Sequence, residues 1–188
     1  MEPIQDRILL LKARNFDTIP FIPIRELEEL LTETVIRDVI YKCGIDAPKR
    51  EETIQIVVSG AKKIFATLIL LHKEHLVRKF IEQDQFQIEK LDAKLPLSDV
   101  WLRELLGQAT GSLFWEKQWM FVAPFFRYDL SHRILEDATI LPFINKTFIG
   151  EGGFGAVFKV ELHPQHQGVK EFEDDAQVRV VTLSANSH

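Results

Sequence analysis

The glycine-rich stretch from Ile149 to Val160 constrains the fold more strongly than any other part of the sequence. Its glycines at 150, 152 and 155, followed by a valine at 157, make the pattern G-x-G-x-x-G-x-V. β-prone residues precede the glycines, and apolar residues alternate after them at 158, 160 and 162. This pattern predicts a β-hairpin. A dinucleotide-binding glycine turn leads instead into a helix, and no helical pattern follows here.

A glycine hairpin of this kind can close over a polyphosphate, because without Cβ atoms its backbone N–H groups approach phosphate oxygens closely. Ile149 and Val157 flank the loop, where they would cover a flat base, and Phe154 at the tip would shield the phosphates from water. The alternative is an ordinary hairpin with a glycine-rich bulge. The candidate nucleotide-binding residues of the loop are Ile149, Gly150, Glu151, Gly152, Gly153, Phe154, Gly155 and Val157.

The stretch resembles the glycine-rich loop of eukaryotic protein kinases, which has this spacing. The longer segment from Leu141 to His166 resembles a group of fungal proteins in which a helical region of unassigned role precedes a kinase domain. The resemblance implies that residues 139–172 form a small antiparallel fragment of a kinase N-lobe with ATP as its ligand. In complete relatives it implies ATP-dependent phosphorylation of protein Ser/Thr hydroxyls, with Mg²⁺ held only by a complete kinase domain.

A kinase also needs a lysine on its third strand to hold the nucleotide phosphates. Lys170, within Gln167–Phe172, is the candidate, and the alternative is a solvated lysine on a strand. The 188 residues contain neither H-R-D-L-x-x-x-N nor D-F-G, so we assign no catalytic residue and no metal ligand. We therefore expect a partial ATP site without phosphoryl transfer, as in a truncated or alternatively spliced product, and a loosely ordered tail over residues 173–188.

Residues 1–138 are expected to form a mainly helical domain, which makes the fold class mainly α. Apolar spacing predicts a helix over Arg25–Cys43, broken near Thr32, and a second helix running from Glu51 to about Leu71. Glu51 and Glu52 are expected in the first turn of that second helix, where carboxylates favour the helix dipole. Its side chains at 64, 65, 68 and 69 are predicted to form the centre of the core.

Three shorter helices are predicted further along the chain. One covers about Glu74–Asp84; another begins at a Ser98 cap and stops at Gly107; a third begins at a Ser112 cap. The segment from Phe86 to Leu97 is expected to be a polar connector.

Composition narrows the function classes. The net charge of −5 gives no basic footprint for nucleic acid, and the single cysteine, Cys43, suits a reducing compartment. The longest apolar stretch, Ile64–Leu71, is far shorter than the ~20 residues that span a membrane, so we expect the cytoplasm or nucleus. His72 and His75 are expected to be structural or surface residues. The alternative function is a non-catalytic helical module that docks a protein partner, with an inert glycine hairpin.

Overall fold

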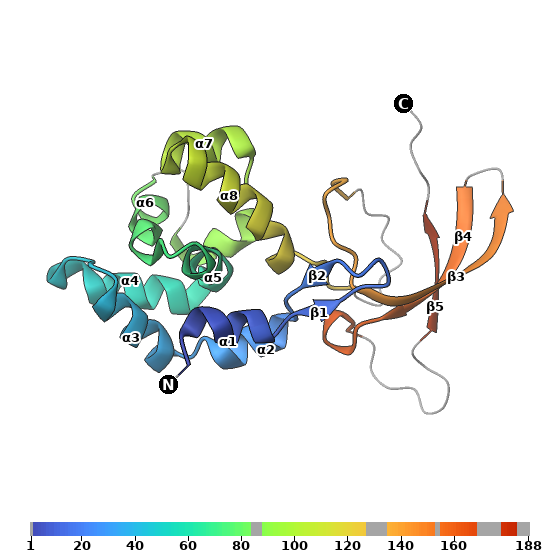
Figure 1. Cartoon of the computed structure of the whole chain (residues 1–188), viewed down its shortest axis with the longest axis horizontal. Coiled ribbons are helices and arrows are strands. Elements are labelled where there is room, and N and C mark those ends of the chain that lie inside the picture. The colour runs from blue at the N-terminus through green and yellow to red at the C-terminus, as the bar shows by residue number, and fades with distance from the viewer. Residues whose placement is uncertain (1, 84–87, 127–134, 153–154, 169–177, 184–188) are drawn as a thin grey trace. The chain divides into compact units, whose positions relative to one another are not determined.

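The computed structural model describes residues 2–83, 88–126, 135–152, 155–168 and 178–183 (Figure 1). Within them lie eight α-helices and two small antiparallel sheets, so the expected mainly helical class is confirmed. The chain divides into two compact units. The helical unit comprises Met1–Lys12 and Ile22–Val122, and the hairpin unit comprises Ala13–Phe21 and Ala123–His188.

The helical unit is built around α5, in which every residue from Ile64 to Ile69 is buried. This confirms the core centre predicted from apolar spacing. The α-helices of the unit are α1 (Ile4–Leu10), α2 (Ile24–Leu30), α3 (Glu33–Lys42), α4 (Ala47–Gly60), α5 (Lys62–Leu70), α6 (Val77–Ile81), α7 (Asp99–Leu106) and α8 (Gln108–Gln118). The 3₁₀ turns are η1 (Glu74–Leu76), η2 (Ile88–Lys94) and η3 (Trp119–Phe121).

Three helix boundaries lie where the local capping residues predicted them. The Thr32 hydroxyl accepts the Val35 N–H at the start of α3, which separates α2 from α3 where the break was expected. The Ser98 hydroxyl accepts the Trp101 N–H at the start of α7. Gly107 ends α7 with φ of +88°, a conformation that glycine adopts without strain.

The helix predicted from Glu51 to about Leu71 is wrong in two respects. It begins earlier, at Ala47, so Glu51 and Glu52 lie beyond the first turn. It is also two helices, α4 and α5, which bend by 109° at Ala61. After the bend, α5 is buried from Ile64 to Ile69, whereas α4 keeps one exposed side.

A partly buried carboxylate from a distant segment holds this corner. The backbone N–H groups of Lys63 and Ile64, in the first turn of α5, donate to Asp92 Oδ2 and Oδ1 at 2.8 and 3.0 Å. Asp92 lies in η2, within the stretch that was predicted to be a polar connector, and its neighbour Leu91 is buried. The connector prediction was therefore wrong: this segment supplies the missing N-cap of α5.

Asp92 gives a pH-dependent prediction for stability. Burial raises the pKa of Asp92 from 3.8 to about 6, against the opposing effects of the two backbone donors and the Lys63 ammonium group. Between pH 3.8 and about 6, Asp92 therefore keeps its proton in the folded chain and loses it in the unfolded chain. The stabilisation from that proton is complete below pH 3.8 and is lost as the pH rises through 6.

Urea unfolding of the wild type and Asp92→Asn from pH 4 to 7.5 measures the effect. The wild type should lose stability relative to the variant as the pH rises, by at most about 3 kcal/mol. The other titrating groups are present in both proteins, so their contributions cancel when the two free energies of unfolding are subtracted. A wild type that instead gains on the variant with rising pH would show that the two N–H donors outweigh burial.

The end of the helical unit also differs from the prediction. The helix assigned to a Ser112 cap begins earlier, at Gln108, and the Ser112 hydroxyl donates back to the Gln108 carbonyl at 3.0 Å. Within this helix, a Cβ placed at Gly111 would lie 2.5 Å from the Arg103 backbone. Helices α7 and α8 therefore touch backbone to backbone at this point. The helix predicted over Glu74–Asp84 is shorter, consisting of η1 followed by α6.

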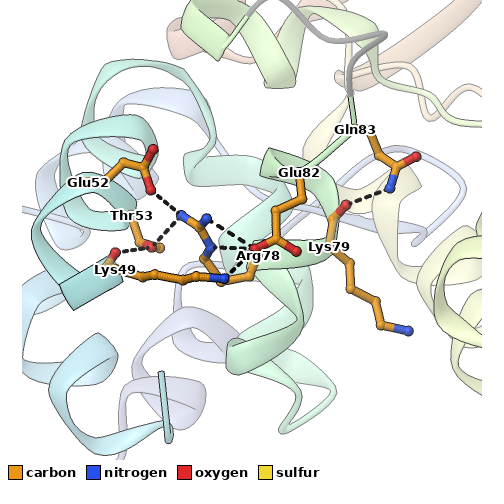
Figure 2. Close-up of polar contacts among 7 residues, drawn as sticks. All are labelled: Lys49, Glu52, Thr53, Arg78, Lys79, Glu82 and Gln83. Atoms are coloured by element: carbon orange, nitrogen blue, oxygen red, sulfur yellow. Dashed lines mark hydrogen bonds and ion pairs between the residues drawn. The ribbon is translucent and has the colours of Figure 1, made fainter. Parts of the chain in front are cut away.

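An Arg78 network joins α6 to α4 (Figure 2). Arg78 Nη1 donates to Glu52 Oε2 at 2.6 Å and to Thr53 Oγ1 at 3.3 Å. Its Nη2 donates to Glu82 Oε1 at 3.1 Å, and Lys49 Nζ donates to the same oxygen at 3.0 Å. Lys49 first, and Arg78 second, lower the pKa of Glu82. The Arg78 side chain is 15% exposed, but its partners Glu52 and Glu82 are 56% and 48% exposed, so solvent screens these ion pairs in part.

The hairpin unit contains the two sheets. Strands β1 (Ala13–Arg14) and β2 (Pro20–Phe21) form one, and β3 (Phe143–Gly152), β4 (Gly155–Leu162) and β5 (Val178–Leu183) form the other, in the order β3-β4-β5 (Figure 1). The core of the unit consists of Phe143, Val160 and Leu162, packed against Phe16, Phe126, Leu141 and Phe158. Turn η4 (Pro164–His166) follows β4.

Candidate nucleotide-binding hairpin

The glycine stretch forms the β-hairpin that the sequence predicted. Strands β3 and β4 pair antiparallel, from Phe143 opposite Leu162 to Gly152 opposite Gly155 at the turn. The pairing therefore brings the candidate residues at 149–152, 155 and 157 to the turn end of one hairpin. Two further candidates, Gly153 and Phe154, lie outside the described residues.

A β-bulge interrupts β3 within the candidate site. Phe148 lies opposite Phe158, but the next pair is Gly150 with Val157, so Ile149 is an extra residue in β3. The Ile149 side chain is 54% exposed. A bulge in the glycine stretch is the feature that the alternative, an ordinary hairpin with a glycine-rich bulge, predicted, although its position at Ile149 was not specified.

Gly150 has no structural need to be glycine. Its φ lies outside the left-handed region, and no atom of the described residues lies within 4 Å of a Cβ built there. The fold therefore leaves an open space above the first glycine of the motif. By contrast Gly107 is required by its positive φ, and Gly111 by close packing.

The two faces of the hairpin have different surroundings. Phe158, Val160 and Leu162 lie on the face that packs into the core of the hairpin unit. Val157 and Lys159 lie on the opposite face; Val157 is half-buried and Lys159 is exposed. The alternation predicted from the sequence is therefore confirmed. A planar ligand near Ile149 and Val157 would lie on the face that the core leaves free.

The proposed phosphate lysine is not placed by the structure. Lys170 lies outside the described residues, and the third strand of the sheet is β5, further along the chain. β5 pairs antiparallel with β4, from Ala156 opposite Leu183 to Glu161 opposite Val178. β5 therefore lies within residues 173–188, which were expected to be a loosely ordered tail, and the role of Lys170 stays a prediction.

A second candidate binding feature lies in the helical unit. A groove of about 440 Å³ runs between α1, α3 and the turn before η1, and it includes Cys43 and His72. Burial raises the pKa of the Cys43 thiol, which donates to the Ile40 carbonyl at 3.4 Å. Sequence reasoning missed the groove because its lining comes from three separate segments. The charged residues that line it are Glu2, Arg7, Asp38, Lys42 and Glu74.

Two further findings concern metal binding and membrane spanning. Among the residues that the structure describes, no three His, Cys, Asp or Glu side chains are grouped to hold a metal ion. No single helix in the described ranges is long and apolar enough to cross a membrane, and only the bent pair α4–α5 passes that test, by length and composition.

Comparison with protein-family models, with curated proteins and with solved structures finds no match. The geometry of the hairpin is therefore the basis for a functional proposal.

Proposed function

We propose that the β3–β4 hairpin is a partial ATP-binding site, of the type that the glycine-rich loop of a protein-kinase N-lobe provides. The observation that carries the proposal is the open space at Gly150, beside the exposed side chain of Ile149. The fold requires neither a glycine nor an exposed isoleucine there. A ligand with a flat apolar base and a phosphate tail would use both, because the base covers Ile149 and the phosphates approach the bare backbone.

Phosphoryl transfer by this chain alone is not part of the proposal. Transfer requires a base for the attacking hydroxyl and carboxylates for the metal ions. The 188 residues contain no motif that supplies either group. Water would also screen the remaining contacts on an open hairpin face. ATP should therefore bind weakly, with a Kd on the order of 1 mM, and transfer should be absent.

ATP titration of the purified chain, followed by NMR or calorimetry, tests the proposal. Binding should be saturable, and Gly150→Val should weaken it about tenfold, since a branched side chain would fill the space above the loop. The thermal midpoint of the variant should stay unchanged because the Cβ meets no atom. Glu161→Ala, at the far end of β4, is the matched control and should bind as the wild type does.

Two results would contradict this reading. ATP binding that does not saturate, or that Gly150→Val leaves intact, would contradict the proposed nucleotide site. Incorporation of labelled phosphate into a protein substrate that disappears in Lys170→Met would show that the chain catalyses transfer after all.

The alternative proposal is a non-catalytic role in which the helical unit docks a protein partner and the hairpin is inert. The groove between α1 and α3 favours it, because it offers apolar walls with charges of both signs at its rim. Substitutions at Asp38 or Lys42 would then impair partner binding while Gly150→Val would not.

A further inference from the structure

The groove in the helical unit has walls that the fold holds in place. Its volume of about 440 Å³ lies within the range of small-molecule sites. On α1, Gln5 Nε2 donates to the Leu70 carbonyl at 3.1 Å, which ties this helix to the end of α5. On α3, Ile36 and Ile40 are fully buried and anchor the second wall. The groove is therefore preformed, so a ligand would not have to order it.

The third wall is the turn after α5, whose conformation is unusual. The Lys73 N–H donates to the Leu68 carbonyl at 2.9 Å, and the His72 N–H donates to the Ile69 carbonyl at 3.1 Å. These are the two bonds of a Schellman cap. His72 occupies its left-handed position, with φ of +54°, where glycine is the usual residue. Capping therefore does not explain the histidine, and its side chain lines the groove.

The lining of the groove combines apolar side chains with charges of both signs. Ile4 of α1 and Val35 and Val39 of α3 are half-buried apolar residues. Arg7 on α1 and Glu74 on η1 are also half-buried. Neither forms an ion pair with any residue that the structure describes. Partly desolvated charges without a partner are costly, and opposite charges on a ligand would offset that cost.

From these features we propose that the groove binds a zwitterion with an apolar body, either an apolar amino acid or a short apolar peptide with free termini. Arg7 binds the carboxylate through its planar guanidinium group, and Glu74 binds the ammonium group. Val35 and Val39 contact the apolar side chains of the ligand. Charge complementarity selects this class, since an anion or a cation alone would leave one of the two charged groups unpaired.

The proposed site is separate from the proposed ATP site. The groove belongs to the helical unit and the glycine loop to the hairpin unit. ATP should therefore neither compete with the zwitterion nor depend on it. The proposal also gives the groove a small ligand, where the alternative function gives it a protein partner.

Cys43 makes occupancy of the groove measurable, because it lines the groove and is the single cysteine of the chain. Burial first, and then the nearby Glu74 charge, raise the pKa of its half-buried thiol. Chemical labelling of the thiol at about pH 8 should therefore be slow but measurable. A ligand in the groove should slow it further.

Calorimetry and Cys43 labelling of the full chain with dileucine test the proposal. Dileucine should bind saturably, with a Kd on the order of 0.1 mM, and should slow labelling over the same concentration range. Dileucine with an acetylated amino end and an amidated carboxyl end keeps the apolar body but carries neither charge. It should bind at least about tenfold more weakly. Leucine is the third probe: the tighter of leucine and dileucine shows whether the ligand is an amino acid or a peptide.

Variants test the residues that the proposal assigns. Arg7→Gln and Glu74→Gln should each weaken dileucine binding about tenfold, because each removes one charge pair. Arg25→Gln is the matched control, since it removes the same charge from an exposed side chain of α2 outside the groove, and it should bind as the wild type does. His72→Gly should weaken binding while its thermal midpoint stays unchanged or rises, since glycine fits the left-handed position better.

Thermal unfolding of each variant separates a lost site from a lost fold. A wild type that shows no saturable binding of leucine or dileucine, or that binds capped dileucine equally well, would overturn the proposal. Dileucine binding that leaves Cys43 labelling unchanged would also overturn it, because the ligand would then occupy another surface. These measurements use the wild type alone, so they remain decisive even if a variant fails to fold.

Discussion

Replacing Leu68 with alanine is expected to lower the free energy of unfolding of the helical unit by about 2 to 5 kcal/mol. Leu68 is fully buried on α5, and its neighbours Phe65 and Ile69 are fully buried as well. The substitution removes apolar contacts and leaves a cavity that close-packed neighbours fill only in part. Urea unfolding monitored by circular dichroism measures the loss.

Leu10→Ala is the matched control for this experiment. It is the same chemical change in the same unit, but Leu10 is 72% exposed on α1. Its effect should stay within about 0.5 kcal/mol, which is typical of surface positions. A loss of the same size at both positions, or below about 0.5 kcal/mol at Leu68, would contradict the burial of α5.

Gly111→Ala should destabilise the helical unit. In an exposed helix interior this change stabilises by about 1 kcal/mol, because alanine has the higher helix propensity. At Gly111 the new Cβ would lie 2.5 Å from the Arg103 Cα, and backbone cannot move aside as a flexible side chain does. Helices α7 and α8 would have to separate, at a net cost of about 1 to 3 kcal/mol or more.

Thermal and urea unfolding of Gly111→Ala test this expectation. Gly150→Ala is the control, since its Cβ meets no atom within 4 Å, and it should leave stability nearly unchanged. A Gly111→Ala variant as stable as the wild type would mean that α7 and α8 do not meet backbone to backbone.

Sequence reasoning predicted the features of the fold that depend on neighbouring residues. Thr32 and Ser98 cap helices through contacts three residues away, and Gly107 stops α7 through its own φ. The corner at Ala61 depends on Asp92, which is 28 and 29 residues away from the two N–H groups that it accepts. No local pattern contains that information.

In the candidate site, too, local features were predicted and those that depend on distant residues were missed. The hairpin and its two faces were predictable because strand alternation and glycine turns are local patterns. A bulge was expected only under the alternative of an ordinary glycine-rich hairpin, and its position at Ile149, which decides which side chains share a face, was not specified. The groove in the helical unit was also missed, since α1, α3 and the turn at His72 approach one another only in the folded chain.

The interleaving of the two units affects how the chain folds during synthesis. Residues Ala13–Phe21 belong to the hairpin unit, but they leave the ribosome before almost all of the helical unit, whose second part ends at Val122. The Phe16 N–H therefore cannot bond to the Phe143 carbonyl until that residue has been synthesised. The Phe21 ring likewise cannot pack against His166 until His166 has been synthesised. The early segment therefore lacks its partners from residues 123–188 while the helices form. For the same reason an expression boundary between Val122 and Ala123 would leave part of the hairpin unit on the wrong fragment.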